Sequence, residues 1–157
     1  PVQPDTKVDP GAGQGTVVAD AGQPPKPAQP VAVDAGTAAK LDEARKAYDA
    51  ANGNVRKLQP VGAKLQEVLA KDPDNPDALT LMAQVYLEQQ KLEDALKTSN
   101  RCTEVAPSSA ACWLTIGVIQ ETKRAKEIAK LAYQKYLELA PDGRYANDAR
   151  KALGRLK

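Results

Sequence analysis

Histidine and phenylalanine are absent from the 157 residues, and the chain has only two cysteines, one tryptophan and one methionine. Without histidine, the commonest general base, triad member and metal ligand is missing. Two cysteines alone do not complete a tetrahedral zinc site. The glycine-rich run at residues 11–15 lacks the Lys-Ser/Thr ending of a phosphate-binding loop. We therefore expect no catalytic residues, no metal site and no cofactor.

The chain also lacks long apolar runs and a strong excess of one charge. No stretch approaches the ~18 apolar residues that a membrane-spanning helix needs, and the start of the chain does not have the charged-then-apolar form of a signal peptide. The net charge of +2 is too small to indicate a nucleic-acid partner. Membrane contact is expected only through an anchor upstream of the given sequence.

Positive charge gathers at the carboxy-terminal end, where residues 122–157 hold ten Lys or Arg and four acidic residues. These side chains form a candidate basic patch for acidic partners. The alternative is a solvated face, since basic residues commonly complement helix carboxy termini. The members of the candidate patch are Lys123, Arg124, Lys126, Arg144, Arg150, Lys151, Arg155 and Lys157.

Three prolines, Pro73, Pro107 and Pro141, recur at a constant interval of 34 residues. A pair of antiparallel helices with its two turns occupies about 34 residues. Proline cannot continue a helix, so each of the three is expected just after the second helix of a pair. The period predicts stacked helical hairpins.

Apolar and small residues repeat within this period. Large apolar residues at helical spacing predict one buried stripe on each helix, and small residues let neighbouring helices approach closely. One unit contains Leu79, Met82, Ala83, Tyr86, Ala95, Ser99 and Pro107. The next contains Trp113, Ile116, Gly117, Gln120, Ala129, Tyr133 and Pro141.

Both units resemble the tetratricopeptide repeat, whose pattern is a large residue, Leu-Gly, Tyr, Ala, a bulky residue and a closing Pro. The resemblance implies an all-α helix-turn-helix solenoid, a right-handed superhelix of about seven helices. We expect a disordered Pro/Ala/Gly-rich linker over residues 1–36, then a degenerate repeat at 37–75, repeats at 76–109 and 110–143, and a capping helix at 144–157.

The degenerate unit is expected to start its first helix after Thr37 and to end it at Asn52-Gly53-Asn54, where Gly53 can adopt the left-handed conformation. Its second helix is expected to begin near Pro60, because proline is tolerated in a first turn. A kinked helix from Val55 is the alternative.

The linker indicates a tether. Because the chain begins with Pro1 and not Met, we expect a segment to be missing upstream. The composition resembles the spacers of bacterial surface lipoproteins, which favours an extracytoplasmic location, in the periplasm or tethered to the outer membrane. It equally resembles the stretch before the repeat-containing tail of a bacterial Ser/Thr kinase, and a cytoplasmic location is the alternative.

Cys102 and Cys112 lie on either side of the turn around Pro107. In an antiparallel hairpin this symmetry brings the two side chains to similar heights, so a disulfide is one hypothesis, and it implies an oxidising compartment. The other is a pair of free cysteines that pack as small apolar residues, because Cys102 stands where the repeat usually has Ala.

The resemblance implies a protein-interaction module whose first helices line a concave groove for an extended peptide or a partner's helix. A regulatory tail of a larger enzyme is the alternative. Family members that hold a carboxy-terminal carboxylate use Lys, Arg and Asn, and here Ala50 and Leu81 stand where Asn would be wanted. An apolar peptide or amphipathic helix fits better. The matching groove positions are Lys46, Thr80, Leu81, Gln84, Glu88, Leu114, Thr115, Val118, Glu121, Tyr145 and Asp148. For Leu81 and Leu114 the alternative is a role in packing between adjacent first helices.

Overall fold

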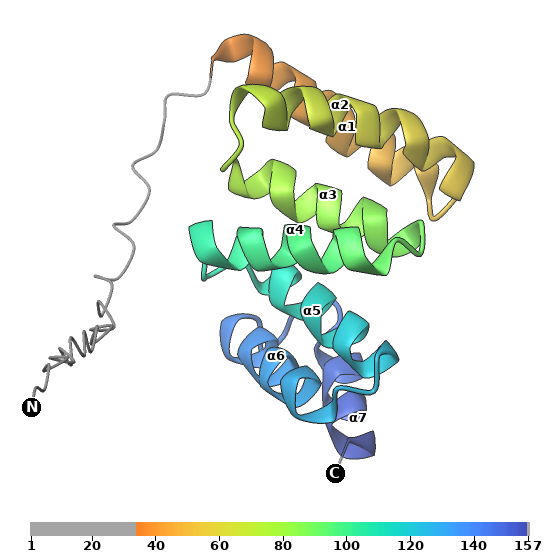
Figure 1. Ribbon diagram of the computed structural model, residues 1–157, viewed down its shortest axis with the longest axis vertical. Coiled ribbons are helices and arrows are strands. Elements are labelled where there is room, and N and C mark those ends of the chain that lie inside the picture. Colours follow the sequence, from red (N-terminus) through yellow and green to blue (C-terminus); the bar gives the residue numbers. More distant parts are fainter. Residues whose placement is uncertain (1–33, 157) are drawn as a thin grey trace, which may run out of the picture.

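The computed structural model describes residues 34–156, and within this range every regular element is a helix (Figure 1). The expected linker at residues 1–36 lies largely outside this range, and the basic-patch residue Lys157 lies wholly outside it. The seven helices are α1 (Ala35–Ala51), α2 (Val55–Lys71), α3 (Pro76–Glu88), α4 (Leu92–Val105), α5 (Ala110–Thr122), α6 (Lys126–Leu139) and α7 (Ala146–Arg155). The expected all-α solenoid of about seven helices is confirmed.

The helices stack as successive hairpins along the long axis of the molecule (Figure 1). Helices α1 and α2, α3 and α4, and α5 and α6 form the pairs, and α7 packs on α6. The first helices also contact one another in series, α1 with α3 and α3 with α5. One side of the stack is therefore built from the odd-numbered helices. No helix in the described range is long and apolar enough to cross a membrane.

Two large apolar clusters stabilise the two ends of the stack. The first joins α1, α2 and α3 and includes Leu58, Val61, Leu65 and Val68, all fully buried. The second joins α5, α6 and α7 around Tyr133 and the buried alanines of α7. A small cluster at the α4–α5 junction connects them, so the described residues form a continuous stack with no break in packing.

The start of α2 differs from the expectation. The helix begins at Val55, so Pro60 is its sixth residue and not part of its first turn. The Asn54 side chain caps the helix by accepting a hydrogen bond from the Arg56 N–H at 3.1 Å. Because Leu58 is fully buried, the turn before Pro60 is stabilised by packing, which offsets the hydrogen bond that an interior proline removes. The prediction of a start near Pro60 is wrong, and the alternative start at Val55 holds.

Helix α1 also begins earlier than expected, at Ala35 and not after Thr37. The Asp34 carboxylate accepts hydrogen bonds from the Thr37 N–H at 3.0 Å and the Thr37 hydroxyl at 2.9 Å, which places Thr37 inside the first turn. The expected end at Asn52-Gly53 is confirmed. Gly53 has φ of +76°, and Asn52 is left-handed as well, with φ of +44°.

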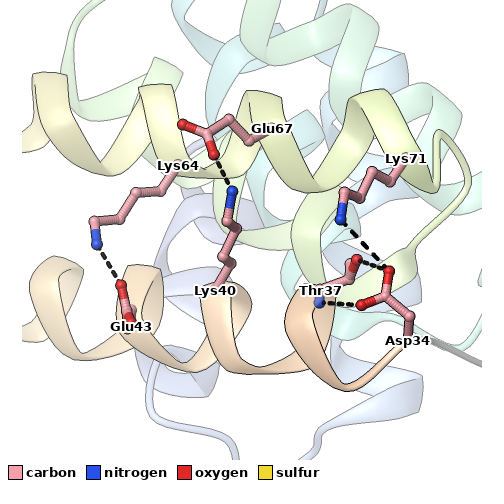
Figure 2. A network of polar contacts seen from close by, with 7 residues as sticks. All are labelled: Asp34, Thr37, Lys40, Glu43, Lys64, Glu67 and Lys71. Carbon is pink, nitrogen blue, oxygen red and sulfur yellow. Dashed lines mark hydrogen bonds and ion pairs between the residues drawn. The ribbon is translucent and has the colours of Figure 1, made fainter.

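A ladder of ion pairs runs along the exposed side of α1 and α2 (Figure 2). Lys40 pairs with Glu67, and Lys64 with Glu43 at 2.5 Å. Glu43 lies three residues after Lys40 on α1, and its partner Lys64 lies three residues before Glu67 on α2. The second pair therefore has its charges reversed relative to the first. Exposed ion pairs each contribute little to stability because solvent screens them, but alternating signs disfavour a shifted register. The ladder adds a preference for this antiparallel alignment to that of the buried apolar cluster.

Gly117 on α5 shows why a glycine occupies a helix interior. A Cβ atom there would lie only 2.8 Å from the ring of Tyr133 on α6, so the aromatic side chain fills the space that any larger residue would take. One repeat earlier the same two positions are Ala83 and Ser99, both buried. A larger residue on one helix is thus matched by a smaller one on its neighbour, as close packing requires.

Gln90 and Arg124, which occupy equivalent positions in the two full repeats, end α3 and α5 with φ of +60° and +61°. The following N–H groups close the turns, from Lys91 to the Tyr86 carbonyl and from Ala125 to the Gln120 carbonyl. Only glycine adopts this backbone region without steric cost.

Replacing Gln90 by Gly is expected to raise the free energy of unfolding by about 0.5–1 kcal/mol, because relief of left-handed strain exceeds the entropic cost of glycine. Chemical denaturation of the purified chain measures the change. Gln89→Gly is the matched control, since Gln89 has φ of −78° and should only lose stability. Equal losses in both variants would contradict the prediction.

Candidate functional site

A concave pocket of about 460 Å³ opens on the side of the stack formed by the odd-numbered helices. Helices α1, α3, α5 and α7 each contribute to its lining, and Tyr133 reaches it from α6. The pocket thus spans the stack from its first helix to its last. Its lining residues are Tyr48, Gln84, Leu87, Glu88, Leu114, Thr115, Val118, Glu121, Thr122, Tyr133, Tyr145, Asp148, Ala149, Ala152 and Arg155.

Most of the groove residues expected from the sequence meet in this pocket, and three do not. Lys46 is exposed on α1 but outside the lining. Leu81 is only 6% exposed and packs in the cluster of α1, α2 and α3, so the expectation that it contacts a ligand is wrong. Thr80 is half-buried at the α4–α5 junction, where its hydroxyl lies 3.3 Å from the Cys102 Sγ and 3.4 Å from the Cys112 Sγ.

Two tyrosine–glutamate pairs organise the polar side of the pocket. The Tyr133 hydroxyl donates to Glu121 Oε2 at 2.7 Å, and the Tyr48 hydroxyl donates to Glu88 Oε1. Burial raises the pKa of both tyrosines, and the neighbouring carboxylates raise it further. Both hydroxyls therefore stay protonated as donors at neutral pH.

The second oxygen distinguishes the two glutamates. Glu121 Oε1 accepts a hydrogen bond from Arg155 Nη2 on α7 at 2.9 Å, so this carboxylate is satisfied on both sides. Glu88 Oε2 is buried and has no hydrogen-bond partner among the described residues. A buried polar atom without a hydrogen-bond partner is uncommon in folded proteins, so the Glu88 carboxylate is a candidate for a role in binding.

Sequence reasoning missed several of the lining residues. The repeat pattern includes Tyr133 and the basic patch includes Arg155, but periodicity alone does not say that these residues meet Tyr48 in one pocket. The pairing of Tyr133 on α6 with Glu121 on α5 arises only because Gly117 admits the tyrosine ring against α5. The spacing between Tyr48 and Glu88, which lie on α1 and α3, carries no local signal.

Several side chains of the basic patch form ion pairs or hydrogen bonds with neighbouring residues of the chain. Lys123 pairs with Glu93 at 2.6 Å and Arg155 with Glu121, while Arg150 donates to the Pro141 carbonyl at 2.7 Å. Three of the eight patch residues are therefore engaged within the chain, which weakens their attraction for an outside partner. Lys123 and Arg124 lie in the turn after α5, Lys126 begins α6, and Arg150, Lys151 and Arg155 lie on α7.

The structure places a disulfide between Cys102 on α4 and Cys112 on α5, with Cα atoms 6.3 Å apart. Both residues are fully buried and pack against Leu79. The bond links the second helix of one repeat to the first helix of the next. It therefore staples the junction between the two full repeats. No group of three or more Cys, Asp or Glu in the described range is placed to hold a metal ion.

Glu121 gives the pocket a pH-dependent contribution to stability. The hydrogen bond from Tyr133, and then the one from Arg155, holds the pKa of Glu121 below its ordinary value of 4.5. The unfolded chain therefore takes up this proton first as the pH falls. The contribution is fully present above pH about 5 and is lost as the pH falls below 4.5 toward the folded-state pKa.

Glu121→Gln is accordingly expected to flatten the fall in melting temperature between pH about 5 and about 3. Thermal unfolding followed by circular dichroism across this range measures the effect. Glu138→Gln, an equal change at an exposed site whose partner is Lys135, serves as the control. Parallel pH profiles for the wild type and Glu121→Gln would refute the role of this carboxylate.

Stacked helical hairpins with a concave pocket on the side of their first helices define a helical-repeat solenoid. Two family models of the tetratricopeptide repeat match the chain, at residues 62–116 and 110–142. The chain is a tetratricopeptide repeat protein. A search of curated proteins finds no match.

Solved structures of the same fold agree with this family. The TPR domain of Arabidopsis OM64 has 16% identity and a TM-score of 0.66, with 78% of this chain and 98% of that chain covered. The first TPR of Spaghetti (RPAP3), bound to the HSP90 peptide SRMEEVD, has 22% identity and a TM-score of 0.66, covering 76% and 94%. The second TPR domain of human RPAP3, in complex with the HSP70 peptide SGPTIEEVD, has 18% identity and a TM-score of 0.63, covering 77% and 98%. At these identities the likeness concerns the fold.

Proposed function

We propose that this chain is a non-catalytic protein-interaction module that holds an extended peptide or a partner's helix in its concave pocket. The observation that carries the proposal is the pocket itself, which brings Leu114 and Val118 of α5 into one lining with polar residues of α1, α3 and α7. Ligand sites commonly combine an apolar lining with a few placed polar groups, and the volume is within their usual range. The absence of histidine from the whole sequence supports a role without catalysis.

Two solved structures of the same fold contain acidic chaperone peptides, SRMEEVD and SGPTIEEVD. They support peptide binding as the general mode of action. The acidic class of ligand suits this pocket poorly, because its lining includes the carboxylates of Glu88, Glu121 and Asp148. Lys46, the one basic residue among the expected groove positions, lies outside the lining. The proposed ligand is therefore a different kind of segment.

The proposed setting is an oxidising, extracytoplasmic compartment, with the module held by a flexible tether. Support comes from the placement of Cys102 and Cys112 at bonding distance, since disulfides persist mainly outside the reducing cytosol. The Pro- and Gly-rich composition before residue 34 suits a spacer. Detection of the protein in periplasmic or surface fractions of its source cells would test the compartment, and its recovery with two free thiols would contradict it.

Binding to the pocket is tested by capturing partners with the wild-type chain and with Val118→Glu. Val118 is half-buried in the lining, so a new carboxylate there should block an apolar ligand segment. Leu131→Glu is the matched control, because Leu131 on α6 is 66% exposed and outside the pocket. Circular dichroism shows whether both variants remain folded.

A protein retained by the wild type and by Leu131→Glu, but lost with Val118→Glu, is the expected result. Its binding segment should then show a dissociation constant in the micromolar range by calorimetry, since a short groove offers a small interface with few anchors. Retention that ignores Val118→Glu would place the binding surface elsewhere and contradict the proposal.

A further inference from the structure

The charges of the pocket are unequal. Three carboxylates, those of Glu88, Glu121 and Asp148, and one guanidinium, that of Arg155, belong to its lining. This guanidinium forms an ion pair with Glu121, with Arg155 Nη2 2.9 Å from Glu121 Oε1. An excess of negative charge therefore remains on a concave, partly enclosed surface, where a low local dielectric strengthens its field.

Glu88 is the carboxylate with an unfilled hydrogen bond. Its Oε1 accepts from Tyr48, while its Oε2 is buried without a partner among the described residues. Glu121 shows how such an oxygen is normally satisfied, because Arg155 supplies the donor there. The Glu88 side of the pocket has the same tyrosine–glutamate pair and lacks the cation.

Three tyrosines share this lining. Tyr48 comes from α1, Tyr133 from α6, and Tyr145, which is 42% exposed, from the turn before α7. Aromatic faces attract cationic groups, and Arg144 already lies over the Tyr145 ring at 5.4 Å. The aliphatic stem of a long cationic side chain would find apolar contacts on Leu87, Leu114 and Val118.

We infer that the pocket binds a partner segment through a lysine or arginine anchor flanked by apolar residues, with the cation paired to the Glu88 carboxylate. The inference rests on the proposed function and specifies its ligand. It assigns this pocket a charge preference opposite to that of the acidic peptides bound by the two RPAP3 domains. The charge complementarity and the unfilled oxygen both favour this occupant.

The test begins with selection of short randomised peptides, displayed on phage, against the full chain. Peptides whose binding is lost with Val118→Trp, which narrows the pocket without adding charge, define the pocket ligands, and enrichment of Lys or Arg among them is expected. One such peptide is then synthesised with its anchor cation, with norleucine and with glutamate at that position, and each affinity is measured by calorimetry.

The cationic peptide should lose at least roughly tenfold in affinity on change to norleucine, and more on change to glutamate. Glu88→Gln should weaken the cationic peptide by a similar factor and leave the norleucine peptide nearly unchanged. Glu138→Gln, the same substitution at an exposed site outside the pocket, should alter neither affinity. The norleucine arm needs no protein variant, so the test stands even if Glu88→Gln folds poorly.

Two different failures can be told apart. Pocket-bound peptides that are enriched in acidic residues, or that bind equally well with norleucine, would overturn the cation inference and leave the proposed function intact. Selection that yields no peptide sensitive to Val118→Trp would overturn the proposed function, and the inference with it.

Discussion

Reduction of the Cys102–Cys112 disulfide is expected to lower the free energy of unfolding by about 3 kcal/mol, the chain-entropy value for a short closed loop. The two cysteines are ten residues apart and enclose the turn between α4 and α5. Since this turn joins the two full repeats, the loss should appear as weaker coupling between them. Calorimetry with and without reductant should show a fall in melting temperature of roughly 10 °C.

A double replacement by alanine separates the cross-link from the packing of sulfur. Cys102→Ala with Cys112→Ala removes the bond and two buried sulfur atoms, so the variant should be at least as unstable as the reduced wild type. Reductant should have no effect on it. Intact mass spectrometry under denaturing conditions should show a wild type two hydrogens lighter before reduction than after. An unchanged mass on reduction would contradict the disulfide.

Leu58→Ala is expected to destabilise the chain by about 2–5 kcal/mol, the range for a leucine removed from a packed core. Leu58 is fully buried on α2, in the turn that precedes Pro60. The cost should be high because this one side chain anchors the turn against the break that Pro60 favours. Urea denaturation gives the change in free energy, and the slope of the transition should stay constant.

Val55→Ala is the control for this substitution, because Val55 lies in the same turn of α2 and is 48% exposed. Its effect should stay within about 0.5 kcal/mol. An equally small loss of stability in Leu58→Ala would contradict the packing of α2 before Pro60. The helix would then start near Pro60, as the tolerance of proline in a first turn predicts.

Sequence spacing and local propensity predicted most of the fold, and they were wrong where tertiary packing overrode them. The proline spacing and the apolar stripes predicted the hairpins, since a helix that repeats its apolar face every 34 residues has to stack on its neighbours. The start near Pro60 was wrong because a propensity rule cannot see that Leu58 is buried. The start after Thr37 was late because Asp34 caps the helix from outside the apolar pattern.

The candidate site divides in the same way. Gln84, Leu114 and Val118, which the resemblance to the tetratricopeptide repeat placed in the groove, do line the pocket. Leu81 was placed there in the same way but packs inward. The division of the chain at residues 36, 75, 109 and 143, and the binding roles of the groove residues, stay predictions.

The sequence by itself determined the helical-repeat class and the period of stacking, because these follow from spacing along a helix, and its resemblance to the tetratricopeptide repeat implied the side on which a groove would form. Only the tertiary structure decided that Tyr48 meets Glu88, that Arg155 satisfies Glu121, and that one oxygen of Glu88 has no donor within residues 34–156. Such contacts join helices far apart in the chain. They depend on side-chain packing and interhelical geometry, which periodicity does not encode.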